Sequence, residues 1–181
     1  MLPVVYILAM NMNRPRFLHE PPTAESGFDT AQVCINGHEI NASTRLSPEF
    51  NEKFCGTCGS ETITACPACK APIRGHLRGS LATSYTPPKF CNGCGKAFPW
   101  TASALQAARM YADELSELSP EERQLLKGAL DDLVKDTPAT PLAASRFKKL
   151  LRKAGSGALE AMRKLVIDIV SDTAKKAITG Q

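Results

Sequence analysis

The chain has few aromatic side chains and no hydrophobic run long enough to span a bilayer. Aromatic residues make up 6% of its 181 residues, which limits any core built without another stabilising element. No stretch approaches the roughly 20 apolar residues of a transmembrane helix. The sequence also has no His-Glu-x-x-His motif, no phosphate-binding lysine loop and no Gly-x-Ser-x-Gly motif. We therefore expect neither an enzyme nor a membrane protein.

Cysteine, by contrast, is plentiful and regularly placed. All seven cysteines and one of the three histidines fall into four close pairs. The pairs are Cys34 with His38, Cys55 with Cys58, Cys66 with Cys69, and Cys91 with Cys94. A two-residue spacer lets a tight turn direct two thiolates at one zinc ion, and eight ligands complete two tetrahedral sites. The sequence therefore predicts two Zn²⁺ ions per chain.

Chain order gives the simplest assignment of these ligands. The first site would hold Cys34, His38, Cys55 and Cys58, and the second would hold Cys66, Cys69, Cys91 and Cys94. An interleaved arrangement, first pair with third and second with fourth, is the alternative. Gly59 and Gly95 follow the second ligand of their pairs, where we expect a positive φ.

His38 is the one expected nitrogen ligand, and the sequence offers alternatives to it. His19, His76 or a water molecule are the alternatives for the fourth position of the first site. We prefer His38 because it lies beside an otherwise unpaired cysteine, with the turn-forming Asn36-Gly37 between them.

Two other roles for these cysteines fit the sequence less well. A catalytic zinc keeps an open position for water, whereas eight protein ligands fill two sites. A thioredoxin-like redox pair needs a strand-to-helix context, which none of the three Cys-x-x-Cys pairs has. Metal-ligating thiols also fit a reducing compartment, so we expect a cytoplasmic protein.

The chain divides into three parts that differ in composition and in the spacing of their apolar residues. Residues 1–30 are expected to be a flexible leader, residues 31–100 a double zinc-ribbon domain, and residues 101–181 a helical domain. The apolar run at 2–10 lacks the basic flank and cleavage site of a signal peptide. A further interpretation of this leader is that translation starts at Met10 or Met12. The fold class predicted is a small metal-bound α+β protein, with two tandem zinc-ribbon or knuckle modules before about four helices.

Apolar spacing and capping signals place the four expected helices. The first begins near Thr101, and the second follows the capping box at Ser119-Pro-Glu-Glu122. The third runs from Thr140-Pro141 to about Gly155, and the fourth from about Ala158 to Ile178. The apolar stripe of the second helix is expected to comprise Leu125, Leu126, Ala129, Leu130 and Leu133.

Charge is uneven along the helical part. Residues 102–136 carry 4 basic and 8 acidic side chains, and residues 137–181 carry 9 basic and 3 acidic ones. We prefer the interpretation that these charges pair across a helical bundle. The alternative is a basic ridge for phosphate or anionic lipid. That ridge would comprise Arg146, Lys148, Lys149, Arg152 and Lys153.

Aromatic and basic residues also gather around the second predicted site. The preferred interpretation is that Phe90, Phe98 and Trp100 fill the small ribbon core against the first helix. The alternative is a surface for single-stranded nucleic acid, which uses cations and stacking rings. The residues of that alternative are Arg74, Arg78, Lys89, Lys96 and Trp100. Metal binding would lower the net charge from +4 to +1, which weakens this alternative.

The ordered set of motifs resembles a known family. The motifs are Ala31-Gln-Val-Cys-Ile-Asn-Gly-His38, Phe54-Cys-Gly-Thr-Cys-Gly59, Cys66-Pro-Ala-Cys69, Ile73-Arg-Gly75, and Phe90-Cys-Asn-Gly-Cys-Gly95 through Phe98-Pro-Trp-Thr101. They resemble an uncharacterised bacterial family, domain of unknown function 2321. Asp136-Thr-Pro138 and Arg146-Phe-Lys-Lys149 are similar to its C-terminal part. The resemblance covers about residues 30–181, and the leader before Phe28 departs from it. It implies a bacterial zinc-ribbon-type protein and supplies no activity.

Closed metal sites together with amphipathic helices favour a non-catalytic adaptor. We expect its helices to bind a protein partner or a second copy of the chain. A nucleic-acid-binding zinc-ribbon protein is the alternative function.

Overall fold

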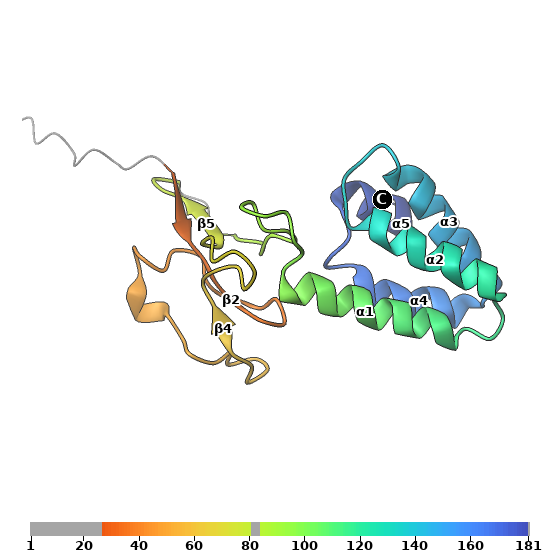
Figure 1. The fold of residues 1–181 in the computed structure, drawn as a ribbon, viewed down its shortest axis with the longest axis horizontal. Coiled ribbons are helices and arrows are strands. Elements are labelled where there is room, and N and C mark those ends of the chain that lie inside the picture. Colours follow the sequence, from red (N-terminus) through yellow and green to blue (C-terminus); the bar gives the residue numbers. More distant parts are fainter. Residues whose placement is uncertain (1–26, 81–83, 181) are drawn as a thin grey trace, which may run out of the picture.

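A computed structural model describes residues 27–80 and 84–180. A small strand-containing module lies at one end of the molecule and a helical bundle at the other, and one helix runs from the first into the second (Figure 1). This arrangement confirms the expected metal-site module followed by helices. Most of the expected leader, residues 1–26, lies outside the described residues.

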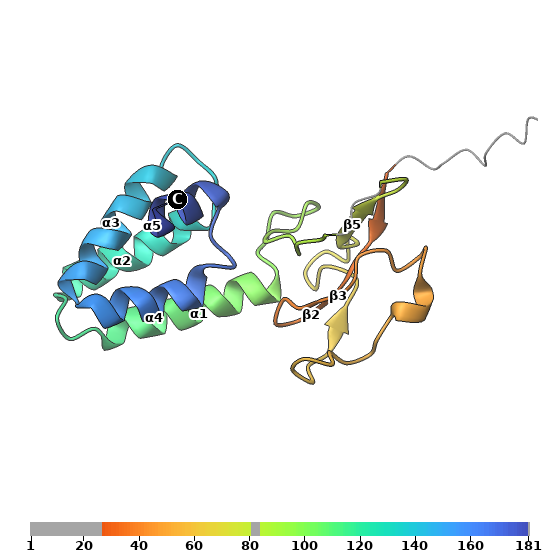
Figure 2. The same ribbon diagram turned by 180° about the vertical axis from the view of Figure 1, so that it is seen from behind.

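The described part of the first module contains five short strands in two small sheets. The strands are β1 (Phe28–Thr30), β2 (Gln32–Cys34), β3 (Glu39–Asn41), β4 (Thr62–Ile63) and β5 (Arg74–Leu77). β2 lies between β3 and β4, while β1 pairs with β5, and every pairing is antiparallel. A 3-10 turn, η1 (Pro48–Phe50), lies between β3 and β4. Figure 2 shows the molecule from the side opposite to Figure 1. The last residues of the expected leader thus form a strand of this module.

The core of the first module is small. Its buried members are Ala31, Val33, Cys66, Ile73, Cys91, Phe98 and Trp100. The rings of Phe98 and Trp100 stack with their centroids 4.7 Å apart. So little apolar area is a weak basis for an independent fold, and such modules commonly use metal ions as additional cross-links.

The second module is a bundle of five helices. They are α1 (Pro99–Glu114), α2 (Pro120–Leu133), α3 (Thr140–Lys153), α4 (Ser156–Val166) and α5 (Asp172–Thr179). α1 lies beside α4 in both views, and α3 packs against α2 and α5 (Figures 1 and 2). The bundle core is larger than that of the first module and is built mainly of leucine, alanine and valine, with Phe147 and Met162.

Local signals account for most helix boundaries. Ser119 accepts a hydrogen bond from the Glu122 backbone N–H, and Glu122 accepts one from the Ser119 N–H, which completes the predicted capping box of α2. Thr140 begins α3, and its hydroxyl donates to the carbonyl oxygen of Lys135 at 2.8 Å. Gly155, with φ of +110°, separates α3 from α4.

The expected fourth helix is two helices. The chain leaves α4 after Val166 and begins α5 at Asp172, so the single helix predicted over 158–178 is wrong. Ser171 caps the second of these helices, because its hydroxyl accepts a hydrogen bond from the Ala174 N–H at 3.2 Å. Its own backbone N–H donates to the Leu133 carbonyl oxygen at 2.8 Å, which a continuous helix would not permit.

The first turn of α1 belongs to one core and the rest of the helix to the other. Trp100 is buried in the first module, while Leu105, Ala108 and Ala112 are buried in the bundle. A second connection is made by Lys89, whose Nζ donates to the Val170 carbonyl oxygen at 2.7 Å. The two modules are therefore joined by a shared helix and by a side-chain hydrogen bond.

None of the helices in the described ranges combines the length and the apolar character that crossing a bilayer requires.

Candidate metal centres

The first cluster comes from three separate places in the chain. Cys34 ends β2, His38 precedes β3, and Cys55 and Cys58 lie in the loop before β4. Their ligand atoms all lie within 4.8 Å of one another. The Cys55 Sγ and His38 Nδ1 atoms are 3.5 Å apart, and the Cys34 and Cys58 sulfurs are 3.3 Å apart. In a regular zinc tetrahedron these separations are about 3.6 Å and about 3.8 Å, so the four groups suit one ion.

The second cluster is built from two cysteine pairs. Cys66, Cys69, Cys91 and Cys94 also have all their sulfurs within 4.8 Å of one another. The Cys66–Cys94 and Cys69–Cys91 sulfur separations are 3.9 and 3.6 Å. These values bracket the edge of about 3.8 Å expected for four thiolates around zinc.

The grouping follows chain order. The structure places the first pair with the second and the third pair with the fourth, and the interleaved alternative is not formed. His38 is the histidine that lies with the cysteines of the first cluster. His76 lies elsewhere, on β5, and His19 is outside the described residues.

The three Cys-x-x-Cys pairs each form a backbone turn of the same type. In each, the N–H four residues after the first cysteine donates to that cysteine's carbonyl oxygen at 2.8 or 2.9 Å. The donating residues are Gly59, Lys70 and Gly95, with φ of +69°, +65° and +71°. The positive φ expected at the two glycines is confirmed, and Lys70 adopts the same left-handed conformation without being glycine. In each turn the first cysteine is a buried residue and the second is an exposed one.

Hydrogen-bond donors surround the first cluster. The Asn36 backbone N–H donates to the Cys34 sulfur at 3.3 Å, and its side-chain amide donates to the Cys58 sulfur at 3.5 Å and to the Ser60 hydroxyl at 3.0 Å. The Asn36 amide, together with Ser60, lowers the pKa of the Cys58 thiol to about 5. Burial, by contrast, raises the pKa of the Cys34 thiol. Donors to sulfur stabilise thiolate, the form that binds metal.

The second cluster has a comparable contact. The Gly93 N–H donates to the Cys91 sulfur at 3.3 Å. The backbone N–H of Cys69 contributes most to the lowered pKa of the Cys66 thiol, which is about 7. A Cβ at Gly93 would lie 2.8 Å from the Ala71 side chain, so the two turns of this cluster pack directly together.

The turn of the first cluster packs on the first helix. Gly37, with φ of +92°, lies so close to Trp100 that an added Cβ would be 3.0 Å from the Trp100 Cβ. The Trp100 indole N–H donates to the Pro88 carbonyl oxygen at 3.0 Å. Sequence reasoning identified Asn36 and Gly37 only as turn formers. Their contacts to sulfur and to Trp100 depend on residues distant in sequence, so no local signal revealed them.

The structure shows where the residues of the nucleic-acid alternative lie. Trp100 is only 7% exposed, so its ring is part of the core and cannot stack on a base. Lys89 is directed to the bundle through its bond to Val170. Arg74 lies over the Phe28 ring at 4.4 Å, and Lys96 is exposed on the third Cys-x-x-Cys turn. Arg78 lies just after β5.

A cleft of about 450 Å³ separates the first cluster from the bundle. His38, Tyr85 and Trp100 line one side, and Asp168 and Lys175 line the other. The Tyr85 hydroxyl donates to the Arg74 carbonyl oxygen at 2.7 Å, and burial raises the pKa of Tyr85. Asp168 and Lys175 were not expected near the metal cluster, because their approach depends on the break between α4 and α5.

Comparison with known proteins agrees with the resemblance of the motifs. The family described as uncharacterised proteins conserved in bacteria, domain of unknown function 2321, matches residues 27–178. Comparison with curated proteins and with solved structures gave no match. The match spans both metal clusters and nearly all of the helical bundle. The chain therefore belongs to this bacterial family.

Proposed function

We propose that the protein is a non-catalytic, zinc-binding adaptor in which two Zn²⁺ ions hold a small binding module on a helical bundle. One observation supports the metal part above all others. Eight cysteine and histidine donors converge in two groups of four, each with its ligand atoms within 4.8 Å. Four protein ligands satisfy tetrahedral zinc and leave no position for a reacting water molecule.

Zinc is the metal that suits this donor set. Thiolates with one imidazole, in a compact tetrahedral arrangement, favour zinc over the oxygen-preferring Mg²⁺ and Ca²⁺. The small core of the first module supports a structural role, because metal binding supplies the stability that its few apolar side chains lack. Thiolate ligation also supports a reducing, cytoplasmic setting.

Native mass spectrometry of the purified chain tests the metal assignment. We expect two zinc ions per chain, and one ion after either Cys58→Ser or Cys69→Ser. Both cysteines are exposed, so these changes disturb little packing. Thr57→Ala and Ala68→Ser change exposed neighbours in the same turns and should retain both ions. X-ray absorption should show three sulfurs and one nitrogen at one site and four sulfurs at the other. A single ion in the unaltered chain would contradict the assignment.

A groove on the bundle supports the adaptor role. Leu125, which was expected on the apolar stripe of α2, is 54% exposed. With Gly128 and Ala129 it lines a groove of about 580 Å³ between α2 and α3. The rim carries Glu121 and Arg146. An apolar floor with a charged rim suits an amphipathic segment of a partner protein or of a second copy.

Sedimentation equilibrium with matched variants tests this surface. If the partner is a second copy, the chain should dimerise and Leu125→Ser should weaken the dimer. Met110→Ser is the control, because Met110 is a comparably exposed apolar residue, 59% accessible, on a different helix. If the chain is a monomer, cross-linking to a co-purifying protein should map to α2 and α3 and be lost with Leu125→Ser alone. Equal behaviour of both variants would contradict the proposed surface.

A further inference from the structure

The five basic side chains of α3 do not act as one ridge. Lys153 lies at one end and forms an ion pair with Glu122 of α2, with 2.6 Å between Nζ and Oε1. This pair lowers the pKa of the Glu122 carboxyl. Arg146 lines the α2–α3 groove together with Glu121 and Asp132. These two cations are therefore directed toward the acidic helix α2, as charge pairing across the bundle predicts.

The other three cations line a different groove, between α3 and α5. This groove has a volume of about 530 Å³, within the range of roughly 300–1,000 Å³ that is typical of small-molecule sites. Its lining comprises Pro141, Ala144, Ser145, Lys148, Lys149, Arg152 and Ala177. No acidic side chain belongs to that lining, and in the described ranges no ion pair involves any of the three cations.

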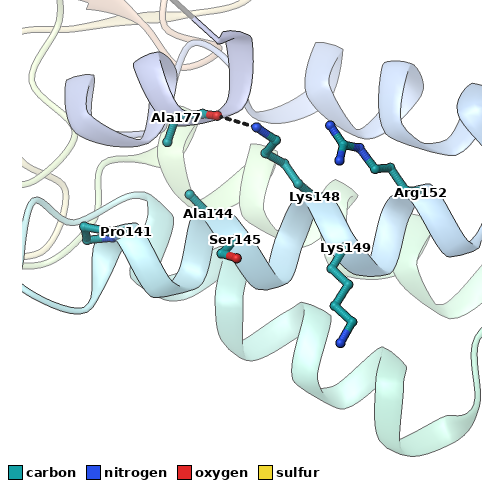
Figure 3. Close-up of a pocket in the computed structure, with 7 residues that line it drawn as sticks. All are labelled: Pro141, Ala144, Ser145, Lys148, Lys149, Arg152 and Ala177. Atoms are coloured by element: carbon teal, nitrogen blue, oxygen red, sulfur yellow. Dashed lines mark hydrogen bonds between the residues drawn. The ribbon is translucent and has the colours of Figure 1, made fainter.

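Lys148 is held in place before any ligand arrives. Its Nζ donates to the Ala177 carbonyl oxygen near the end of α5 at 3.0 Å, and the residue is partly buried. An ammonium group has three N–H donors, so two remain for a ligand. Figure 3 shows Lys148 and Arg152 extending to one side of α3 and Lys149 to the other, with the Ser145 hydroxyl on the helix surface between these directions.

We propose that this groove binds a phosphate-bearing ligand. Cations without protein counter-ions, one of them an arginine that can bind two oxygens at once, suit the compact charge of a phosphate group. The apolar walls at Pro141, Ala144 and Ala177 suit the organic part that carries it. This site is separate from both metal clusters and from the α2–α3 groove, so it adds to the adaptor function and does not depend on it.

Binding of pyrophosphate to the zinc-loaded full chain tests the proposal. In a ¹⁵N NMR titration at an ionic strength of about 0.15 M, where distant surface charges are screened, the amides of Ser145, Lys149 and Arg152 should shift most. Lys149→Gln combined with Arg152→Gln should weaken binding at least about tenfold, because charged hydrogen bonds of this kind each contribute about that factor. Lys148 is left unchanged in this variant because it also holds α5 in place.

The control variant removes the same net charge elsewhere. Lys135 and Lys164 are exposed and do not line the groove, so Lys135→Gln with Lys164→Gln should leave the affinity within about twofold, as expected for screened surface charges. Equal weakening by both double variants would show general charge attraction and would overturn the proposal. Absence of pyrophosphate binding would overturn it too, unless the lipid arm below shows the same variant pattern.

A second arm distinguishes the source of the phosphate. Vesicles of phosphatidylcholine containing phosphatidic acid are mixed with the zinc-loaded chain and floated on a density gradient. Flotation that only the Lys149/Arg152 variant abolishes would assign the site to a lipid headgroup. Pyrophosphate binding without flotation would assign it to a soluble phosphate compound. Either result supports the proposal, and failure of both arms overturns it without affecting the metal assignment.

Discussion

Asn36 shows how one uncharged side chain can influence a metal site without being a ligand. It lies between two ligands in the chain, and both its backbone N–H and its side-chain amide donate to sulfur. Such donors orient the thiolates and favour their deprotonated form, so their loss weakens metal binding even when every ligand remains.

Asn36→Ala should weaken zinc binding at the first site by about tenfold or more, the usual effect of losing a donor to a metal ligand. The pKa of the Cys58 thiol, lowered to about 5 chiefly by this amide, should rise. Because zinc displaces a proton from a protonated thiol, the affinity should then fall more steeply as the pH is lowered from 8 to 6. Competition with a chelator across that range measures the effect. Asn92→Ala, beside a ligand of the second cluster, is the control, and an equal loss there would contradict this role.

The positive φ of the three Cys-x-x-Cys turns gives a second prediction. Gly59→Ala and Gly95→Ala should each destabilise the zinc-loaded protein by about 1 kcal/mol, because a Cβ in the left-handed region is strained. Nothing lies within 4 Å of either added Cβ, so the backbone conformation alone is tested. Lys70→Gly should cause no such loss. Guanidinium unfolding in excess zinc measures these differences, with Gly56→Ala as the control. A loss at Gly56 as large as at Gly59 would count against this explanation.

At the level of elements, the sequence predicted features with a local cause. The ligand pairs, the glycine turns and the Ser119 capping box each depend on neighbouring residues, and each is present in the structure. The break between α4 and α5 depends partly on the contact of Ser171 with Leu133, and the exposure of Leu125 depends on where α3 packs against α2. The approach of Gly37 to Trp100 is likewise tertiary. A pattern of residue types along one chain does not contain these distances.

The cap that separates α4 from α5 can be tested directly. Ser171→Ala removes the hydroxyl that accepts from the Ala174 N–H and should lower the free energy of unfolding by about 1 kcal/mol. Thermal unfolding followed by circular dichroism at 222 nm measures this. Thr173→Ala changes an exposed residue in the first turn of the same helix and should have a smaller effect. An equal effect of both changes would argue that Ser171 is not the cap that matters.

At the level of the whole molecule, the two modules differ in what stabilises them. The first has a small core that includes two ligand cysteines, and the second has a larger core without any predicted ligand. Removal of the metal should therefore affect the modules unequally, since metal binding supplies folding free energy to the first alone.

Trp100 makes that difference measurable. It is the single tryptophan of the chain and lies in the core of the first module. On treatment with a chelator, its fluorescence should shift to longer wavelength as the ring becomes exposed, while most of the ellipticity at 222 nm remains. Re-addition of zinc should reverse the shift. Simultaneous loss of both signals would instead show that the modules fold as one unit.

Because α1 is one continuous helix, it connects the first module directly to the bundle core. Its first turn packs against Gly37, which lies in the loop between two ligands of the first cluster. Its 16 residues extend about 24 Å into the other module. For a helix of that length, a tilt of about 10° at its first turn would displace its last turn by about 4 Å. We expect a change in how the first cluster holds a metal ion to be transmitted along this helix toward its far end, where α1 meets α2.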